Sequence, residues 1–126
     1  MSESEPRPLA EQSCVPCRAG APALGAEKRE ELQRQISPEW RILDGHHLER
    51  EFHFKNFRKA LAFANAIGGI AEQQGHHPEL LVGWGRVKVS LFTHVIDGLH
   101  ENDFILAARI DALPTAGQGD GARPSV

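Results

Sequence analysis

The segment between Asn56 and Gly75 constrains the fold most strongly, because its boundaries and its pattern both predict one long helix. Asn is favoured at a helix start and Gly at a helix end. Apolar residues recur along the segment at spacings of three and four. One stripe consists of Phe57, Ala60, Leu61, Ala64, Gly68 and Ala71, and a second of Phe63, Ile67 and Ile70. A helix that is apolar on two sides either crosses the middle of a domain or also packs against a partner subunit, and Gly68-Gly69 favours close packing.

Strand patterns lie on both sides of this helix. Before it, Trp40–Leu43 is followed by the hairpin turn Asp44-Gly45 and a return strand, Leu48–Phe54. After it, Leu80–Trp84 precedes an alternating run from Arg86 to His94. Strict alternation is typical of a strand with one buried face.

Two further helices complete the pattern. The first spans Ala26–Ile36 and ends before Ser37-Pro38, and the second spans roughly Glu101–Leu113. The order α-β-β-α-β-β-α predicts an α+β fold, with a four-stranded antiparallel sheet and the helices packed on one face.

The two ends of the chain lack such periodicity. Residues 1–23 contain four prolines and predict a flexible N-terminal segment, while residues 114–126 predict a disordered C-terminal tail around one domain at 24–113. The N-terminal segment carries Cys14-Val15-Pro16-Cys17. A closed structural zinc site needs four ligands, so two reduced thiols are the favoured interpretation. A metal site shared by two chains and a redox switch remain open.

Composition excludes several classes of protein. The 126 residues carry a net charge of −3, which gives no reason to expect nucleic acid as the main partner. No apolar run approaches the ~20 residues that a membrane span requires. The acidic, polar start of the chain lacks a signal-peptide core, so a cytoplasmic protein is expected.

Three of the seven histidines mark the candidate site, because they fall where predicted elements end: His76-His77-Pro78 after the long helix and Thr93-His94 after the alternating strand. Three interpretations are open. Adjacent histidines suit a shared zinc site poorly. Histidines incidental to function are the second interpretation. The third is acid–base catalysis, because imidazole gains and loses a proton near neutral pH. Glu72 and Asp103 would then orient the rings.

The sequence resembles the pterin-4a-carbinolamine dehydratase family, in order from about Leu32 to Ile110. The resemblance is carried by Phe52-His53-Phe54-Lys55-Asn56-Phe57, Glu72 with His76-His77-Pro78, Val87-x-Val89-x-Leu91-x-Thr93-His94, and Gly98-Leu99 with Asp103. It implies the same α+β fold and assembly as homodimers or homotetramers. It also implies a hydro-lyase that converts 4a-hydroxytetrahydropterin to quinonoid dihydropterin with no metal or cofactor, the pterin being the substrate.

By position, the resemblance implies that His76 and His94 are the acid–base pair and that His77 mainly binds the pterin. The implied substrate-binding residues are Glu72, His76, His77, Pro78, Thr93, His94, Val95, Ile96 and Asp103. Such an enzyme would recycle the cofactor of an aromatic amino-acid hydroxylase, which implies a functional link to phenylalanine hydroxylase. The alternatives are a binding module that acts as a dimerisation cofactor of a transcription factor, and a paralogue in molybdopterin-related metabolism.

Two positions depart from the family pattern. Leu80 stands where many members have an aromatic residue, and Trp84 is the expected replacement in the pocket wall. His100 stands where Ser or Thr usually precedes the last helix, so a weaker helix cap is expected there.

Overall fold

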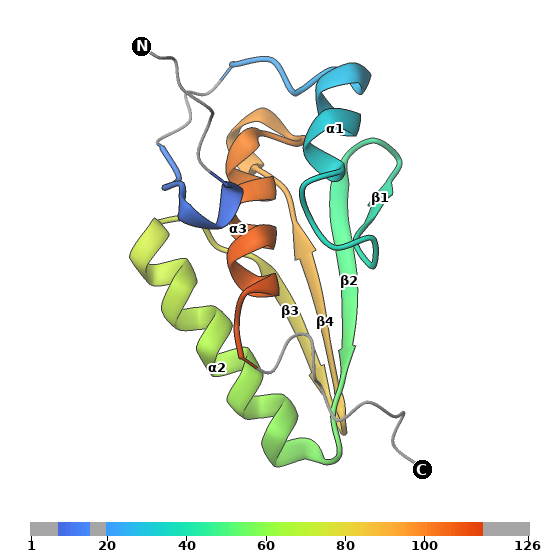
Figure 1. Ribbon diagram of the computed structural model, residues 1–126, viewed down its shortest axis with the longest axis vertical. Coiled ribbons are helices and arrows are strands. Elements are labelled where there is room, and N and C mark those ends of the chain that lie inside the picture. Colours follow the sequence, from blue (N-terminus) through green and yellow to red (C-terminus); the bar gives the residue numbers. More distant parts are fainter. Residues whose placement is uncertain (1–7, 16–19, 115–126) are drawn as a thin grey trace.

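The computed structural model describes residues 8–15 and 20–114, which form a four-stranded sheet with the helices on one side of it (Figure 1). The sheet order is β1-β2-β4-β3, and every neighbouring pair is antiparallel. The α+β fold expected from the sequence is therefore confirmed. In chain order the elements are η1 (Leu9–Glu11), α1 (Ala26–Gln33), β1 (Arg41–Leu43), β2 (His47–His53), α2 (Phe57–Gln74), β3 (Glu79–Gly83), β4 (Arg86–Leu91), η2 (His94–Ile96) and α3 (Glu101–Asp111).

The two central strands bury alternate residues against the helices. Leu48 pairs with Leu91 and Phe52 with Val87, and all four side chains are buried. The alternation of apolar and polar residues along β4 therefore separates the side chains that face the core from those on the outer face of the sheet. Within the described residues, no helix is long and apolar enough to cross a membrane.

Helix α2 begins and ends where the sequence predicts. The Asn56 side chain accepts a hydrogen bond from the Lys59 amide at 2.9 Å, and Gly75 adopts a left-handed conformation with φ 66°. The core-facing residues are Ala60, Phe63, Ala64, Ile67 and Ala71. Residues of both apolar stripes thus face the chain's own core, as expected for a helix that crosses the middle of the domain.

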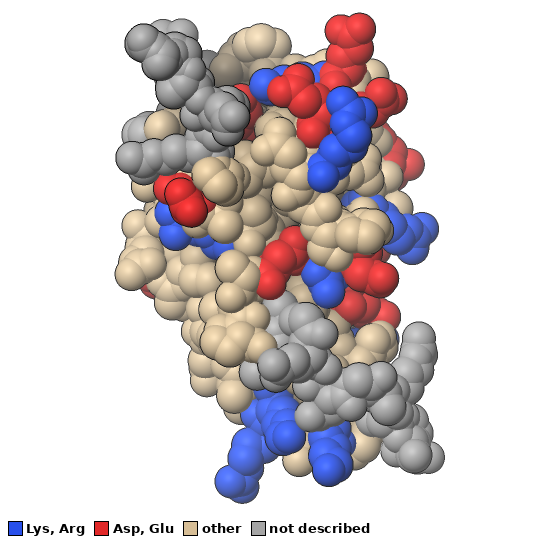
Figure 2. Space-filling model, in the orientation of Figure 1, with Lys and Arg blue, Asp and Glu red and all other residues tan. Residues whose placement is uncertain are grey.

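The apolar residues that α2 leaves uncovered are Phe57 and Leu61, which are 46% and 43% exposed. Figure 2 shows mostly uncharged surface along the middle of α2 and basic side chains near its first turn. Apart from chain neighbours and the backbone of α2 itself, no atom of the described residues lies within 4 Å of where a Cβ on Gly68 or Gly69 would sit. The close packing expected at Gly68-Gly69 is therefore not present within the described part of this chain.

The N-terminal segment differs from the sequence-based prediction where it is described. Leu9 is 5% exposed and belongs to the hydrophobic core, and the Arg109 guanidinium donates to the Gln12 carbonyl at 2.9 Å. Residues 8–15 therefore pack against the domain in the structure. A single apolar anchor and backbone hydrogen bonds leave no periodic pattern in a sequence. Cys17 and residues 115–126 lie outside the described residues.

Helix α3 has a stronger start than expected. The His100 ring accepts a hydrogen bond from the Asn102 amide at 3.0 Å, and Asp103 accepts one from the His100 amide at 2.9 Å. This reciprocal arrangement is a capping box, in which a ring nitrogen takes the place of a Ser or Thr hydroxyl. The expectation of a weaker cap at His100 was wrong.

Candidate active site

The predicted histidines meet in one pocket of about 390 Å³. The pocket lies between the C-terminal end of α2, the loop before β3, the turn η2 and the start of α3. The described residues that line it are Val15, Gly75, His76, His77, Pro78, Thr93, His94, Val95 and Asn102. Gly75 ends α2 in the left-handed conformation and so redirects the chain, which brings His76-His77-Pro78 to the pocket.

A buried carboxylate holds His76. Asp103 is 0% exposed, and its Oδ1 lies 2.6 Å from His76 Nε2. Its Oδ2 accepts hydrogen bonds from the Thr93 hydroxyl and the His100 amide, both at 2.9 Å. An ionised carboxylate only accepts hydrogen bonds, so with Asp103 ionised the donor in this contact is Nε2–H of His76. The Nδ1 atom of neutral His76 is then left with its lone pair.

His77 has a different environment. Its Nε2 lies 2.7 Å from Glu72 Oε2, and the two side chains are 60% and 79% exposed. Exposed ion pairs contribute little to stability, so this pair acts mainly on the orientation of the ring. The adjacent histidines therefore line one pocket with different partners, a buried carboxylate for His76 and a solvated one for His77.

His94 is exposed at the start of η2, which lies in a small closed loop. The Thr93 amide donates to the Gly98 carbonyl at 2.8 Å, and the Gly98 amide donates back to Thr93. The His94 ring packs on Phe92 with 4.2 Å between ring centroids. No hydrogen-bond partner is assigned to the His94 ring within the described residues, so both nitrogens are available to a ligand.

Six of the nine residues expected at the site line the pocket, and Glu72, Ile96 and Asp103 do not. Glu72 and Asp103 instead contact two histidines that do, His77 and His76 respectively. Sequence reasoning missed Val15, because the N-terminal segment was expected to be flexible, and Asn102, because it lies outside the His-His-Pro and Thr-His strings. Trp84 follows the far end of β3 and does not line the pocket, so its expected role in the wall was wrong.

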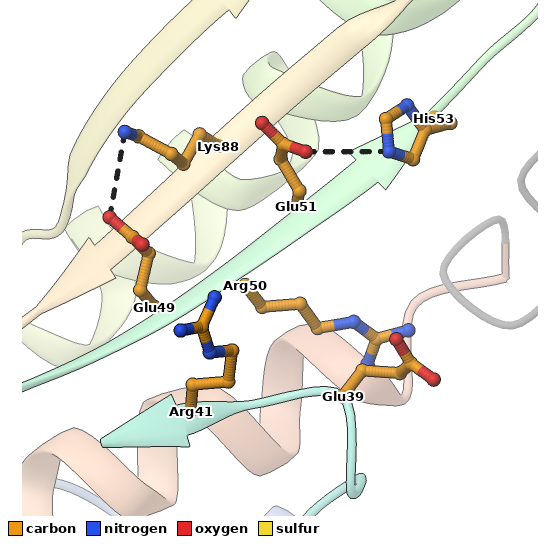
Figure 3. A pocket seen from close by; sticks show the side chains of 7 residues that line it. All are labelled: Glu39, Arg41, Glu49, Arg50, Glu51, His53 and Lys88. Atoms are coloured by element: carbon orange, nitrogen blue, oxygen red, sulfur yellow. Dashed lines mark ion pairs between the residues drawn. The ribbon is translucent and has the colours of Figure 1, made fainter. Parts of the chain in front are cut away.

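A second pocket, of about 400 Å³, is lined by Glu39 and by polar side chains of β1, β2 and β4 (Figure 3). Its charges are balanced, and most are paired: Lys88 with Glu49 at 3.5 Å, His53 with Glu51 at 3.5 Å, and Arg50 with Asp111 at 2.7 Å. It holds one histidine and no partner imidazole. This pocket is therefore less suited to acid–base chemistry than the pocket around His76.

A zinc site was the first of the three interpretations of the histidines. Within residues 8–15 and 20–114, no three side chains of His, Cys, Asp or Glu are grouped so that they could hold a metal ion.

Comparisons with known proteins agree on one family. A model of the family "Pterin 4 alpha carbinolamine dehydratase" matches residues 22–113. Two bacterial relatives are both named "Putative pterin-4-alpha-carbinolamine dehydratase". The chain is 52% identical to the protein from Alkaliphilus metalliredigens over 103 residues, covering 82% of this chain and 93% of the relative. It is 53% identical to the protein from Rubrobacter xylanophilus over 105 residues, covering 83% and 97%.

Two solved structures resemble the fold. One is a "transcriptional coactivator/pterin dehydratase" from Brucella melitensis, with a TM-score of 0.66, 33% identity, and coverage of 71% of this chain and 96% of that one. The other is a pterin dehydratase-like protein described as a RuBisCO assembly factor in the alpha-carboxysome, with a TM-score of 0.53, 30% identity, and coverage of 63% and 90%. The match over residues 22–113 and these identities show that the chain belongs to the pterin-4a-carbinolamine dehydratase family.

Proposed function

We propose that the chain catalyses the loss of water from 4a-hydroxytetrahydropterin, which yields quinonoid dihydropterin. The observation that carries this proposal is the contact between His76 and the buried Asp103, in a pocket that also contains the exposed His94. One imidazole is fixed in a single tautomer by the protein, and the other is free to contact a ligand. Such a pair is suited to moving two protons on one small substrate.

The chemistry requires one base and one acid. A base removes the proton from N5 of the pterin, an acid protonates the 4a-hydroxyl, the C4a–O bond breaks to release water, and a C4a=N5 double bond forms. The Nδ1 atom of His76 and the ring of His94 supply these two functions. Asp103 stabilises the positive charge that His76 carries whenever it holds the second proton.

The remaining residues bind the substrate. His77, oriented by Glu72, offers Nδ1 to a polar atom of the pterin ring, while Pro78 and Val95 offer apolar surface. Within the described lining there is no Lys or Arg. This favours a pterin with an uncharged side chain, such as a biopterin, over a molybdopterin-related compound that carries a phosphate. The protein would then recycle the cofactor of an aromatic amino-acid hydroxylase in the cytoplasm.

A second candidate function is protein binding through the exposed apolar face of α2. Phe57 and Leu61 remain 46% and 43% exposed, and large exposed apolar side chains mark interaction surfaces. The similar structures named as a coactivator and as an assembly factor favour a binding role for some members of this fold. We propose that this face also forms a homodimer or homotetramer.

A stopped-flow dehydration assay on synthetic 4a-hydroxytetrahydropterin tests the enzymatic proposal. We expect a concentration-dependent acceleration over the reaction in buffer. The same assay after treatment with a chelator should give the same rate. A rate equal to that in buffer would favour the binding role.

A further inference from the structure

Residues 8–15 form a strap whose last residue, Val15, lines the candidate active site. Leu9 anchors it in the core, and the Gln12 carbonyl accepts hydrogen bonds from Arg109 of α3. Farther along, the Cys14 amide donates to the Gln74 side chain, at the last residue of α2, at 2.9 Å. The strap therefore joins the two helices that carry the His76 turn and Asp103.

The tightest attachment is at Val15. Its amide donates to Asn102 Oδ1 at 2.9 Å, and its carbonyl accepts from Asn102 Nδ2 at 2.6 Å. Asn102 is 3% exposed and lies next to Asp103 in α3. Two opposed hydrogen bonds to one side-chain amide fix both the position and the orientation of the Val15 backbone, because they engage the peptide groups on both sides of this residue.

The Val15 side chain has no such attachment. It is 56% exposed and lines the same pocket as the three histidines. Val95, in the same lining, is 53% exposed. These two β-branched apolar side chains at the wall of the pocket would be covered when an apolar surface of a ligand enters.

We propose that the strap is a wall of the substrate site. Val15 is a specificity-determining contact for the uncharged ring and side chain of the pterin, and Asn102 positions Val15. This inference rests on the proposed function. The family match begins at residue 22, so this wall is added by residues that precede the matched core.

Val15→Asp tests the contact directly. We expect Kd for 7,8-dihydrobiopterin, measured by calorimetry, and KM for the dehydration to rise about tenfold or more, with kcat unchanged. A tenfold change is about 1.4 kcal/mol, which is within the free energy of covering one Val side chain. Contacts made equally to substrate and transition state alter KM and leave kcat unchanged.

The matched control is Leu81→Asp. Leu81 is 49% exposed on β3 and does not line the pocket. This variant introduces the same charge at a similarly exposed apolar position, and we expect Kd and KM to stay within twofold of the unaltered protein.

Asn102→Ala tests the positioning role. It should raise KM and leave kcat unchanged, and combined with Val15→Asp it should add little, because both act through one contact. Multiplicative effects of the two changes on KM would overturn the positioning role.

If Val15→Asp has the same Kd and the same KM as the unaltered protein, the inference is overturned while the dehydration proposal stands. Strap-dependent binding of dihydrobiopterin without catalysis would support the inference and refute the proposed reaction, and no binding at all would refute both.

Discussion

Replacing Asp103 by Asn separates the orienting role of the buried carboxylate from its contribution to folding. The carboxylate accepts hydrogen bonds from the Thr93 hydroxyl, the His100 amide and His76. An Asn side chain can retain one oxygen for Thr93 and His100 but then presents its NH₂ group to Nε2 of His76. To avoid two opposed donors, His76 must move its proton to Nδ1.

The expected loss of stability is modest. Hydrogen bonds to a charged acceptor contribute about 1.5–3 kcal/mol each and neutral ones about 1 kcal/mol, whereas removing a buried charge offsets part of the loss. We expect Asp103→Asn to lower the free energy of unfolding, measured by urea denaturation, by about 1–3 kcal/mol. The protein should therefore remain folded at 25 °C.

The expected loss of activity is larger. If the lone pair at His76 Nδ1 serves as base or relays the acid proton, kcat should fall by about 10²–10⁴-fold. Nitrogen NMR of the histidine rings should show the Nε2–H tautomer of His76 before the change and the Nδ1–H tautomer after it.

Glu72→Gln is the matched control. It replaces a carboxylate by an amide, as Asp103→Asn does, but in the exposed partner of His77. We expect its kcat to fall by less than about tenfold, because an exposed pair contributes only about 0–1 kcal/mol. Unchanged kcat in Asp103→Asn, despite an inverted His76 tautomer, would refute the role given to that ring.

Three further changes test other parts of the structure. Leu9→Ala should lower the free energy of unfolding by about 2–5 kcal/mol in urea denaturation, as expected for a buried Leu; a change below about 0.5 kcal/mol would show that the segment is not packed. His100→Ala should cost about 0.5–2 kcal/mol through loss of the cap, and His100→Asn should restore most of it. Leu61→Glu should reduce the mass measured by light scattering after size-exclusion chromatography, whereas Leu81→Glu should not. Equal masses for Leu61→Glu and the unaltered protein would contradict the proposed subunit contact.

The sequence predicts most of the fold because its signals are local. Asn56 and Gly75 bound α2 by their side-chain and backbone properties. In β4, the apolar residues Val87 and Val89 alternate with polar residues, which identifies the buried and the outer face of the strand. These features depend on residues a few positions apart, so they can be read without knowledge of the tertiary structure.

Other features depend on contacts between distant residues. Leu9 is an apolar side chain in a proline-containing segment, and its burial depends on the contact of η1 with α3, far along the chain. His100 caps α3 because its ring nitrogen reaches the Asn102 amide, a geometry that residue preferences do not favour. Periodicity likewise identifies two apolar stripes on α2, but it does not show that both contribute to the core while Phe57 and Leu61 stay exposed.

The candidate site shows the same division. The His-His-Pro and Thr-His strings predict which side chains gather in the pocket, and six of the nine expected residues line it. Their roles in catalysis stay a prediction. The contribution of Val15 and Asn102 could not be found from spacing, because the two residues lie 87 positions apart and pair through one backbone unit.

The most direct test of a shared acid–base role is the rate of dehydration in His76→Gln, His94→Gln and the double variant, measured by stopped flow on 4a-hydroxytetrahydropterin. If the two rings serve one substrate, each single change should lower kcat by about 10²-fold or more. The double change should then lower kcat much less than the product of the two, because residues that act as a unit are not additive. Single variants that retain the full rate of the unaltered protein would contradict the assignment.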